Sequence, residues 1–153
     1  MRKALGLAIL GVSLVVAGAA IADTASDAQK TVDQRVAAMK EMGGKVNEAF
    51  QLSGTNAADA RTKLAAALAI AQTITTRFPQ GTADGDPGIT TRALPAIWSN
   101  QAGFQKAADG LVAAIKETDA KLAANDAAGT DAAFGDVRKA CGTCHQDYRG
   151  KAK

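Results

Sequence analysis

The sequence predicts an all-α fold, an antiparallel up-down-up-down bundle of four helices. Beyond the first 22 residues, apolar side chains recur every three or four positions, which is the helical period. Alanine is abundant, aromatic residues make up only 4% of the chain, and no alternating run of β-branched residues is long enough for a sheet. Short polar breaks at residues 53–56 and 125–129 join successive helices as antiparallel neighbours.

The N-terminus has the three parts of a secretory signal. Basic residues 2–3 precede an apolar run over residues 4–20, and an Ala-x-Ala triplet ends the segment. We therefore expect a signal peptide over residues 1–22, cleaved after Ala22, which leaves residues 23–153 as one domain. The run is short for a membrane span and lacks a positive right flank, so we expect no stable membrane insertion after cleavage.

The charge of the chain argues against nucleic-acid binding. The formal charge of +3 at pH 7 includes the two basic residues of the signal, and the remaining excess is small and scattered. We therefore expect small molecules or proteins as partners.

The first helix is expected over residues 25–51. The second is expected to run from Asn56, its N-cap, to Phe78, because Pro79 makes continuation costly. Inward-facing positions of the first helix step by four and three, at Val32, Val36, Met39, Gly43, Val46 and Phe50. Those of the second helix are Leu64, Leu68, Ala71, Ile74 and Phe78.

A long connection over residues 79–97 contains all three prolines but ends in the apolar run Ala-Leu-Pro-Ala-Ile-Trp, so we expect it to cover or line something. The third helix is expected to begin at Ser99 or Asn100. Its inward positions are Phe104, Ala108, Leu111, Ile115, Thr118 and Leu122. The fourth helix is expected to begin near Thr130, with Phe134, Val137, Cys141, Cys144 and Tyr148 on one stripe.

Both cysteines and the single histidine of the chain lie within five positions, at Cys141, Cys144 and His145. Cysteines three apart on a helix project to the same side, and the next residue can turn its imidazole over them. Cys-x-x-Cys-His is the attachment signature of c-type haem, whose vinyl groups form thioethers with the two thiols while the histidine binds iron. The sequence therefore predicts one haem c, attached through Cys141 and Cys144, with His145 as an iron ligand.

Other uses of the two cysteines fit less well. A Cys-x-x-Cys disulfide closes a tiny loop and adds little stability. A thioredoxin-like redox pair follows a strand in an α/β domain, and a structural zinc site needs four ligands, whereas this chain has no second pair. A buried porphyrin also fills volume that the scarce aromatic side chains leave in the core.

The chain resembles the class II cytochromes c, the cytochrome c' family of four-helix bundles with haem near the C-terminus. The resemblance covers essentially residues 23–153. It implies a periplasmic location, because bacteria attach c-type haem outside the cytoplasmic membrane, and a monomer or homodimer. Three stretches carry it: residues 35–43 (RVAAMKEMG), residues 78–81 (FPQG) with 91–98 (TRALPAIW), and residues 141–149 (CGTCHQDYR).

In that family, the residue four positions after the arginine of the first helix lies over the open face of the haem, and here it is Met39. High-spin members place Leu, Phe or an uncoordinated Met there, whereas a low-spin subgroup binds iron through Met. The pattern Arg-x-x-x-Met-Lys-x-x-Gly is closer to the low-spin subgroup. A thioether suits ferrous iron and raises the reduction potential. We therefore predict His145 and Met39 as iron ligands; core packing is the alternative for Met39, and Met42 is a weaker candidate ligand.

Two arginines are candidate haem contacts. Arg35 lies one turn before Met39 and is placed to reach a haem propionate. Arg149 lies four positions after His145, and the resemblance places it close to this haem histidine. A solvated charge is the alternative for each arginine, and Trp98 is expected either at the haem edge or in ordinary core packing.

Two functions follow from these expectations. The leading one is a periplasmic electron carrier that passes single electrons between periplasmic redox proteins through a His/Met low-spin haem. The alternative is a five-coordinate, high-spin haem protein that binds nitric oxide or carbon monoxide, with Met39 only crowding the open iron site. Neither function transforms a substrate, and no catalytic triad, phosphate-binding loop or carboxylate pair stands out, so we do not expect an enzyme.

Overall fold

The computed structural model describes residues 17–151, with side chains from Thr24 onward. Over this range the chain forms no strand, and its one β-bridge joins Ala93 to Arg149. No described helix combines the length and apolar character needed to span a bilayer. The helical elements are α1 (Ala17–Leu52), α2 (Ala57–Ala71), the 3-10 turn η1 (Thr75–Arg77), α3 (Ala96–Ser99), α4 (Gln101–Ala123) and α5 (Ala127–Tyr148).

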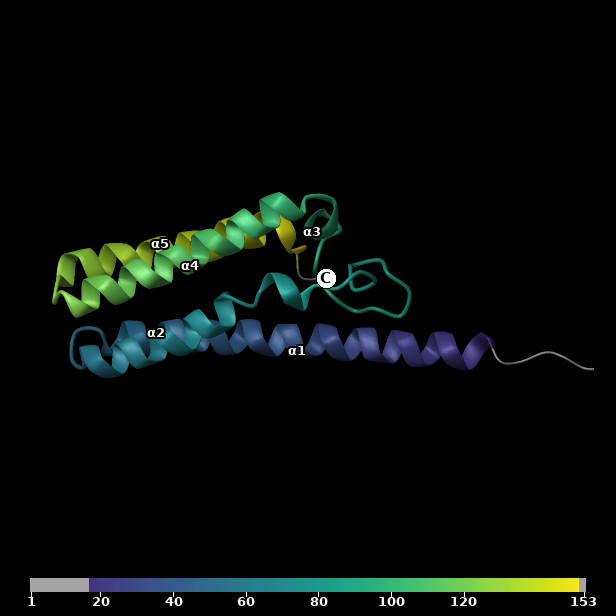
Figure 1. Cartoon of the computed structure of the whole chain (residues 1–153), viewed down its shortest axis with the longest axis horizontal. Coiled ribbons are helices and arrows are strands. Elements are labelled where there is room, and N and C mark those ends of the chain that lie inside the picture. Colours follow the sequence, from purple (N-terminus) through teal and green to yellow (C-terminus); the bar gives the residue numbers. More distant parts are fainter. Residues whose placement is uncertain (1–16, 152–153) are drawn as a thin grey trace, which may run out of the picture.

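Four long helices form the predicted all-α bundle. α1 packs along α2, α2 along α4, and α4 along α5. Figure 1 shows α1 with α2 as one layer and α4 with α5 as the other, with the connection between α2 and α4 at one end. Among the described residues, α1 and α5 make no comparably close backbone contact. The seam between α1 and α5 is therefore the loosest of the four.

The core lies where the four long helices meet, and Met42 and Ala49 of α1 belong to it. Leu64 of α2, Ile115 of α4, and Phe134 and Val137 of α5 are at most 1% exposed. All six positions predicted to face inward on the third helix are buried in α4. On α2 and the turn after it, three of the five predicted positions are buried, whereas Leu68 and Phe78 are half-buried.

The inward stripe predicted for the first helix is partly wrong. Val36 is 42% exposed and Phe50 is 38% exposed, whereas Arg35 and Met42 are buried. The reason is the arrangement of neighbours: α2 is the only helix that packs closely along α1, and the connection covers Arg35, so the rest of the predicted stripe is sealed only in part. Phe50 faces α5 instead, with its ring centroid 5.3 Å from that of Phe134.

Three helices begin at the polar residues that precede them. The side chain of Asn56 accepts a hydrogen bond from the Asp59 amide, as predicted, and Asn100 caps α4 in the same way. Asp126 accepts from the Gly129 amide at 2.9 Å. That cap places the start of α5 at Ala127, three residues before the predicted Thr130.

The second helix ends earlier than predicted. α2 stops at Ala71, and residues up to Phe78 form turns and η1. The Thr73 hydroxyl donates to the Ile70 carbonyl, and the Thr76 hydroxyl donates to the Thr73 carbonyl. These bonds compete with the helical ladder, so the run of threonines ends the helix before Pro79 does.

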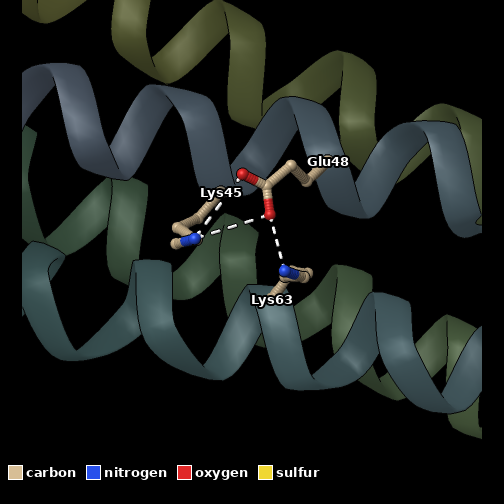
Figure 2. A network of polar contacts seen from close by, with 3 residues as sticks. All are labelled: Lys45, Glu48 and Lys63. Atoms are coloured by element: carbon tan, nitrogen blue, oxygen red, sulfur yellow. Dashed lines mark hydrogen bonds and ion pairs between the residues drawn. The ribbon is translucent and has the colours of Figure 1, made fainter.

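An ion network on the surface ties α1 to α2 (Figure 2). Lys63 of α2 lies 2.7 Å from a carboxylate oxygen of Glu48 on α1, and Lys45 lies 3.5 Å from the same oxygen. All three side chains are partly exposed, so the network orients the helix pair more than it stabilises it.

The predicted signal peptide falls mostly outside the described residues. Its last part, residues 17–22, forms the first turns of α1. Cleavage after Ala22 remains a prediction.

Candidate functional site

The two cysteines lie in the C-terminal half of α5, three positions apart. Both are unpaired and half-buried. Burial raises the pKa of the Cys141 thiol. Burial also raises the pKa of Cys144, and the nearby Cys141 and Asp147 add to that effect while Arg149 opposes it. Both sulfurs are thus neutral thiols on one side of the helix, the form from which thioether bonds are made.

His145 follows directly and is also half-buried. Burial lowers its pKa, and the positive charges of Arg149 and Arg92 lower it further. Its imidazole is therefore neutral at physiological pH, which leaves a nitrogen lone pair free for a metal. The described residues hold no cluster of three or more His, Cys, Asp or Glu side chains able to bind a bare ion.

A cavity of about 270 Å³ lies between α1 and α5, beside Cys141. Most of its wall is apolar, and it occupies the seam where the two helices lack close backbone contact. A larger hollow of about 560 Å³ lies between α2 and α4, but its lining includes no cysteine, no methionine and no histidine. The smaller cavity is therefore the one associated with the cysteine motif. Its lining comprises Met42, Gly43, Val46, Asn47, Phe50, Leu111, Phe134, Val137, Arg138 and Cys141.

Met39 and Met42 of α1 have different environments, and only Met42 lines the cavity. Met42 is 6% exposed, belongs to the core, and lines the cavity. Met39 is half-buried and packs against the core without being sealed in it. Met39 therefore has the freer thioether of the two, whereas Met42 has the packing role that methionine most often has.

Arg35 is buried, with 3% of its surface exposed, and the alternative of a solvated charge is wrong. Its guanidinium donates to the hydroxyl and carbonyl oxygens of Thr82 and to the hydroxyl of Thr91. It also lies 4.5 Å from the centroid of the Phe78 ring. Burial lowers the pKa of Arg35 to about 10, so the side chain stays charged at neutral pH.

Arg149 is exposed, and its backbone amide donates to the His145 carbonyl. Neighbouring backbone groups pair the chain end with the connection: Gly150 N donates to Arg92 O, and Leu94 N donates to Tyr148 O. The pairing brings two arginine charges, those of Arg149 and Arg92, close to His145.

Trp98 packs in a row of aromatic rings. Its indole N–H donates to the Phe78 carbonyl at 3.0 Å, and the two rings meet edge to face. Phe78 contacts Phe104, which in turn contacts Tyr148. Trp98 thus has the core-packing role that was one of its two predicted alternatives.

The residues that hold Arg35 escaped prediction. Thr82 and Thr91 lie 47 and 56 positions from Arg35 in the chain, and neither has a local pattern that marks it as a partner. The only indication in the sequence was the apolar end of the connection, which predicted that this segment packs over another part of the protein without saying which part.

Taken as a chemical set, these groups fit a covalently bound haem. Two neutral thiols share one side of α5, a neutral imidazole follows them, and an apolar cavity opens beside the first thiol. Arg35 adds a buried cation whose described partners are hydroxyl and carbonyl oxygens, without a carboxylate. A porphyrin with anionic propionates would offer the negative charge that these described partners lack.

Comparison with known proteins gives the family. Residues 30–149 match the family described as Cytochrome C'. A cytochrome c' of Rhodopseudomonas palustris is 34% identical over 150 residues, covering 95% of this chain and 92% of that protein. A cytochrome c-556 of Agrobacterium tumefaciens is 36% identical over 124 residues, covering 78% and 97%. A cytochrome c' of Rubrivivax gelatinosus is 42% identical over 76 residues, a match that spans 50% of this chain and 57% of that relative.

Solved structures agree with these matches. The crystal structure of cytochrome c' from Rubrivivax gelatinosus has a TM-score of 0.68 and 28% identity, covering 80% of this chain and 96% of that one. A cytochrome c' described by its ligand-controlled dimer dissociation has a TM-score of 0.70 and 27% identity, covering 81% and 97%. The chain therefore belongs to the cytochrome c' family, four-helix bundles that bind covalently attached haem c.

Proposed function

We propose that this chain is a monohaem cytochrome c' that binds nitric oxide or carbon monoxide. Cys141 and Cys144 hold the haem, and His145 binds its iron from the side of α5. The opposite side faces α1, where the wall of the cavity is mostly apolar, with Asn47 as its one polar side chain from that helix. The observation that carries this proposal is the match over nearly the whole chain to a protein named cytochrome c', a family that is typically high-spin.

Haem iron supplies an open coordination position for a diatomic ligand when only one side chain binds it. The chain has a single histidine, so α1 offers no second imidazole. The apolar side chains of α1 exclude water from the cavity and admit a small uncharged molecule. Met39 then limits the space over the iron by its bulk.

The second candidate is the periplasmic electron carrier, with Met39 as the sixth ligand. Two observations favour it: the half-buried Met39 thioether is not locked in the core, and several relatives are named cytochrome c-556 or cytochrome c-554. His/Met ligation keeps the same coordination in both oxidation states, which suits fast electron transfer.

Matched substitutions distinguish the two functions. Met39→Leu removes the sulfur and keeps the volume, and Met42→Leu is its control one turn further along α1. In a gas binder, the holoprotein is high-spin by visible and paramagnetic-resonance spectra before and after Met39→Leu. In a carrier, the parent is low-spin, Met39→Leu makes it high-spin, and Met42→Leu does not.

The same proposal extends to export and assembly. We infer cleavage after Ala22, a periplasmic domain over residues 23–153, and a monomer or homodimer. Exchange of electrons with periplasmic redox proteins belongs to the second candidate. Arg35 faces a haem propionate and Arg149 stays close to His145. N-terminal sequencing of the exported protein tests the cleavage site, and its mass by light scattering tests the oligomeric state.

A further inference from the structure

Thr82 holds the Arg35 guanidinium by two hydrogen bonds. Its hydroxyl oxygen accepts from one terminal nitrogen at 2.7 Å, and its carbonyl oxygen accepts from the other at 2.6 Å. Thr82 is 1% exposed, so both bonds are shielded from water. Thr91 accepts a third bond at 3.0 Å from the far end of the connection.

The hydroxyl proton of Thr82 is already used. It points to the Pro79 carbonyl, 2.8 Å away, which turns the lone pairs of the oxygen toward Arg35. Gly81, with a φ of +78°, makes the tight turn before Thr82, and the Arg35 guanidinium lies 4.5 Å from the centroid of the Phe78 ring. Residues 78–82 therefore enclose the guanidinium on two sides and fix its direction.

This clamp lies at the same end of the molecule as His145. Thr91 is followed by Arg92, whose carbonyl accepts from Gly150 N at 2.7 Å and whose charge lowers the pKa of His145. Arg35 is also one helical turn before Met39. The described contacts of Arg35 include no carboxylate to cancel its charge.

We propose that Thr82 is the positioning residue that holds the Arg35 cation at the haem end of the bundle and thereby raises the reduction potential of the haem. The inference rests on the proposed haem site. A fixed positive charge near the haem favours the state with the extra electron, and freeing Arg35 to move into solvent weakens that effect. Thr82 acts through Arg35 and needs no contact with the haem.

The test measures the midpoint potential of the purified holoprotein by spectroelectrochemistry. Thr82→Val removes the hydroxyl acceptor, whereas Thr82→Ser keeps a hydroxyl at this position. Thr90→Val is the matched control, because Thr90 is an exposed residue of the same connection whose backbone alone bonds to Gln29.

We expect Thr82→Val to lower the ratio of reduced to oxidised haem about threefold at a fixed applied potential. Thr82→Ser and Thr90→Val keep the parent ratio. Arg35→Gln lowers the ratio as well, and adding Thr82→Val to Arg35→Gln lowers it no further, because both changes act on one charge.

Three results overturn the proposal. The first is a Thr82→Val holoprotein with the midpoint potential of the parent. The second is an equal fall of the midpoint potential in Thr90→Val. The third is that the effects of Thr82→Val and Arg35→Gln add up in the double variant. If Thr82→Val does not accumulate, Thr91→Val replaces it in the test, and we expect it to lower the midpoint potential by a smaller amount. An unchanged midpoint potential in Thr91→Val also overturns the proposal. A colourless parent chain overturns the haem site itself, which separates that failure from failure of the clamp.

Discussion

The backbone of Gly103 on α4 lies directly against the hydroxyl of Tyr148 at the end of α5. A Cβ atom at position 103 would come within 2.6 Å of that oxygen and 2.5 Å of the Asn100 side-chain nitrogen. Tyr148 is buried and its carbonyl pairs with Leu94 of the connection. The missing side chain of Gly103 thus allows the chain end to close over the bundle.

Gly103→Ala should lower the free energy of unfolding by about 1–3 kcal/mol, because overpacking displaces Tyr148 or the Asn100 cap. Gly110→Ala is the control on the same helix, since a Cβ there meets nothing within 4 Å. It should raise stability by up to about 1 kcal/mol through helix propensity. Urea unfolding of the holoproteins measures both, and equal effects at the two positions would contradict the packing argument.

Replacing the cysteines should remove haem stepwise. Cys141→Ser or Cys144→Ser leaves one thioether, which keeps haem on the chain in a denaturing gel and shifts the pyridine haemochrome band. The double variant should carry no covalent haem. Gly142→Ala, between the two cysteines and open to solvent, should keep the parent haem content. Covalent haem on the double variant would disprove this assignment.

Glu48→Gln should weaken the protein at neutral pH and have no effect in acid. The hydrogen bond from Lys63 lowers the pKa of Glu48, with burial opposing it and Lys45 adding to the lowering. A carboxylate with a lowered folded-state pKa contributes stability above its ordinary range, and that stability is lost as pH falls through the lowered value. Urea midpoints measured from pH 7 downward should therefore converge for parent and variant.

Glu41→Gln serves as the control for this titration. Glu41 is an exposed residue of α1 outside the network of Figure 2. Its replacement should leave the urea midpoint at pH 7 unchanged. A constant gap between parent and Glu48→Gln at every pH would show that the ion pair is not the cause.

Gly81→Ala should cost about 1–2 kcal/mol, because an alanine at a φ of +78° is strained. The cost falls on the turn that presents Thr82 to Arg35, so tryptic cleavage after the exposed Arg92 should also become faster. Gly54→Ala, in the turn between α1 and α2 with open space around it, is the control. Slower or unchanged cleavage at Arg92 would argue that the turn and the clamp are independent.

Local patterns predicted the parts of the fold that depend on local geometry. On α4, neighbours lie on both sides, so the apolar stripe from Phe104 to Leu122 coincides with the buried face. On α1, the stripe through Val36 and Phe50 was just as regular, but α5 approaches it only through side chains such as Phe134, so Val36 and Phe50 stay exposed. Periodicity identifies an apolar face and does not say which neighbour covers it.

The site divides in the same way. Cys141, Cys144 and His145 are adjacent in sequence, and their chemistry follows from their spacing. The burial of Arg35 depends on Thr82 and Thr91, which reach it only after the connection has folded back. A contact over such a separation leaves no periodic signal in a single sequence.

The loose seam between α1 and α5 gives the cofactor a structural part to play. Three helix pairs pack closely through their own side chains, whereas an apolar cavity lies between α1 and α5. A haem seated in that cavity would supply the contacts that these two helices do not make with each other, and would so serve as the fourth seam of the bundle.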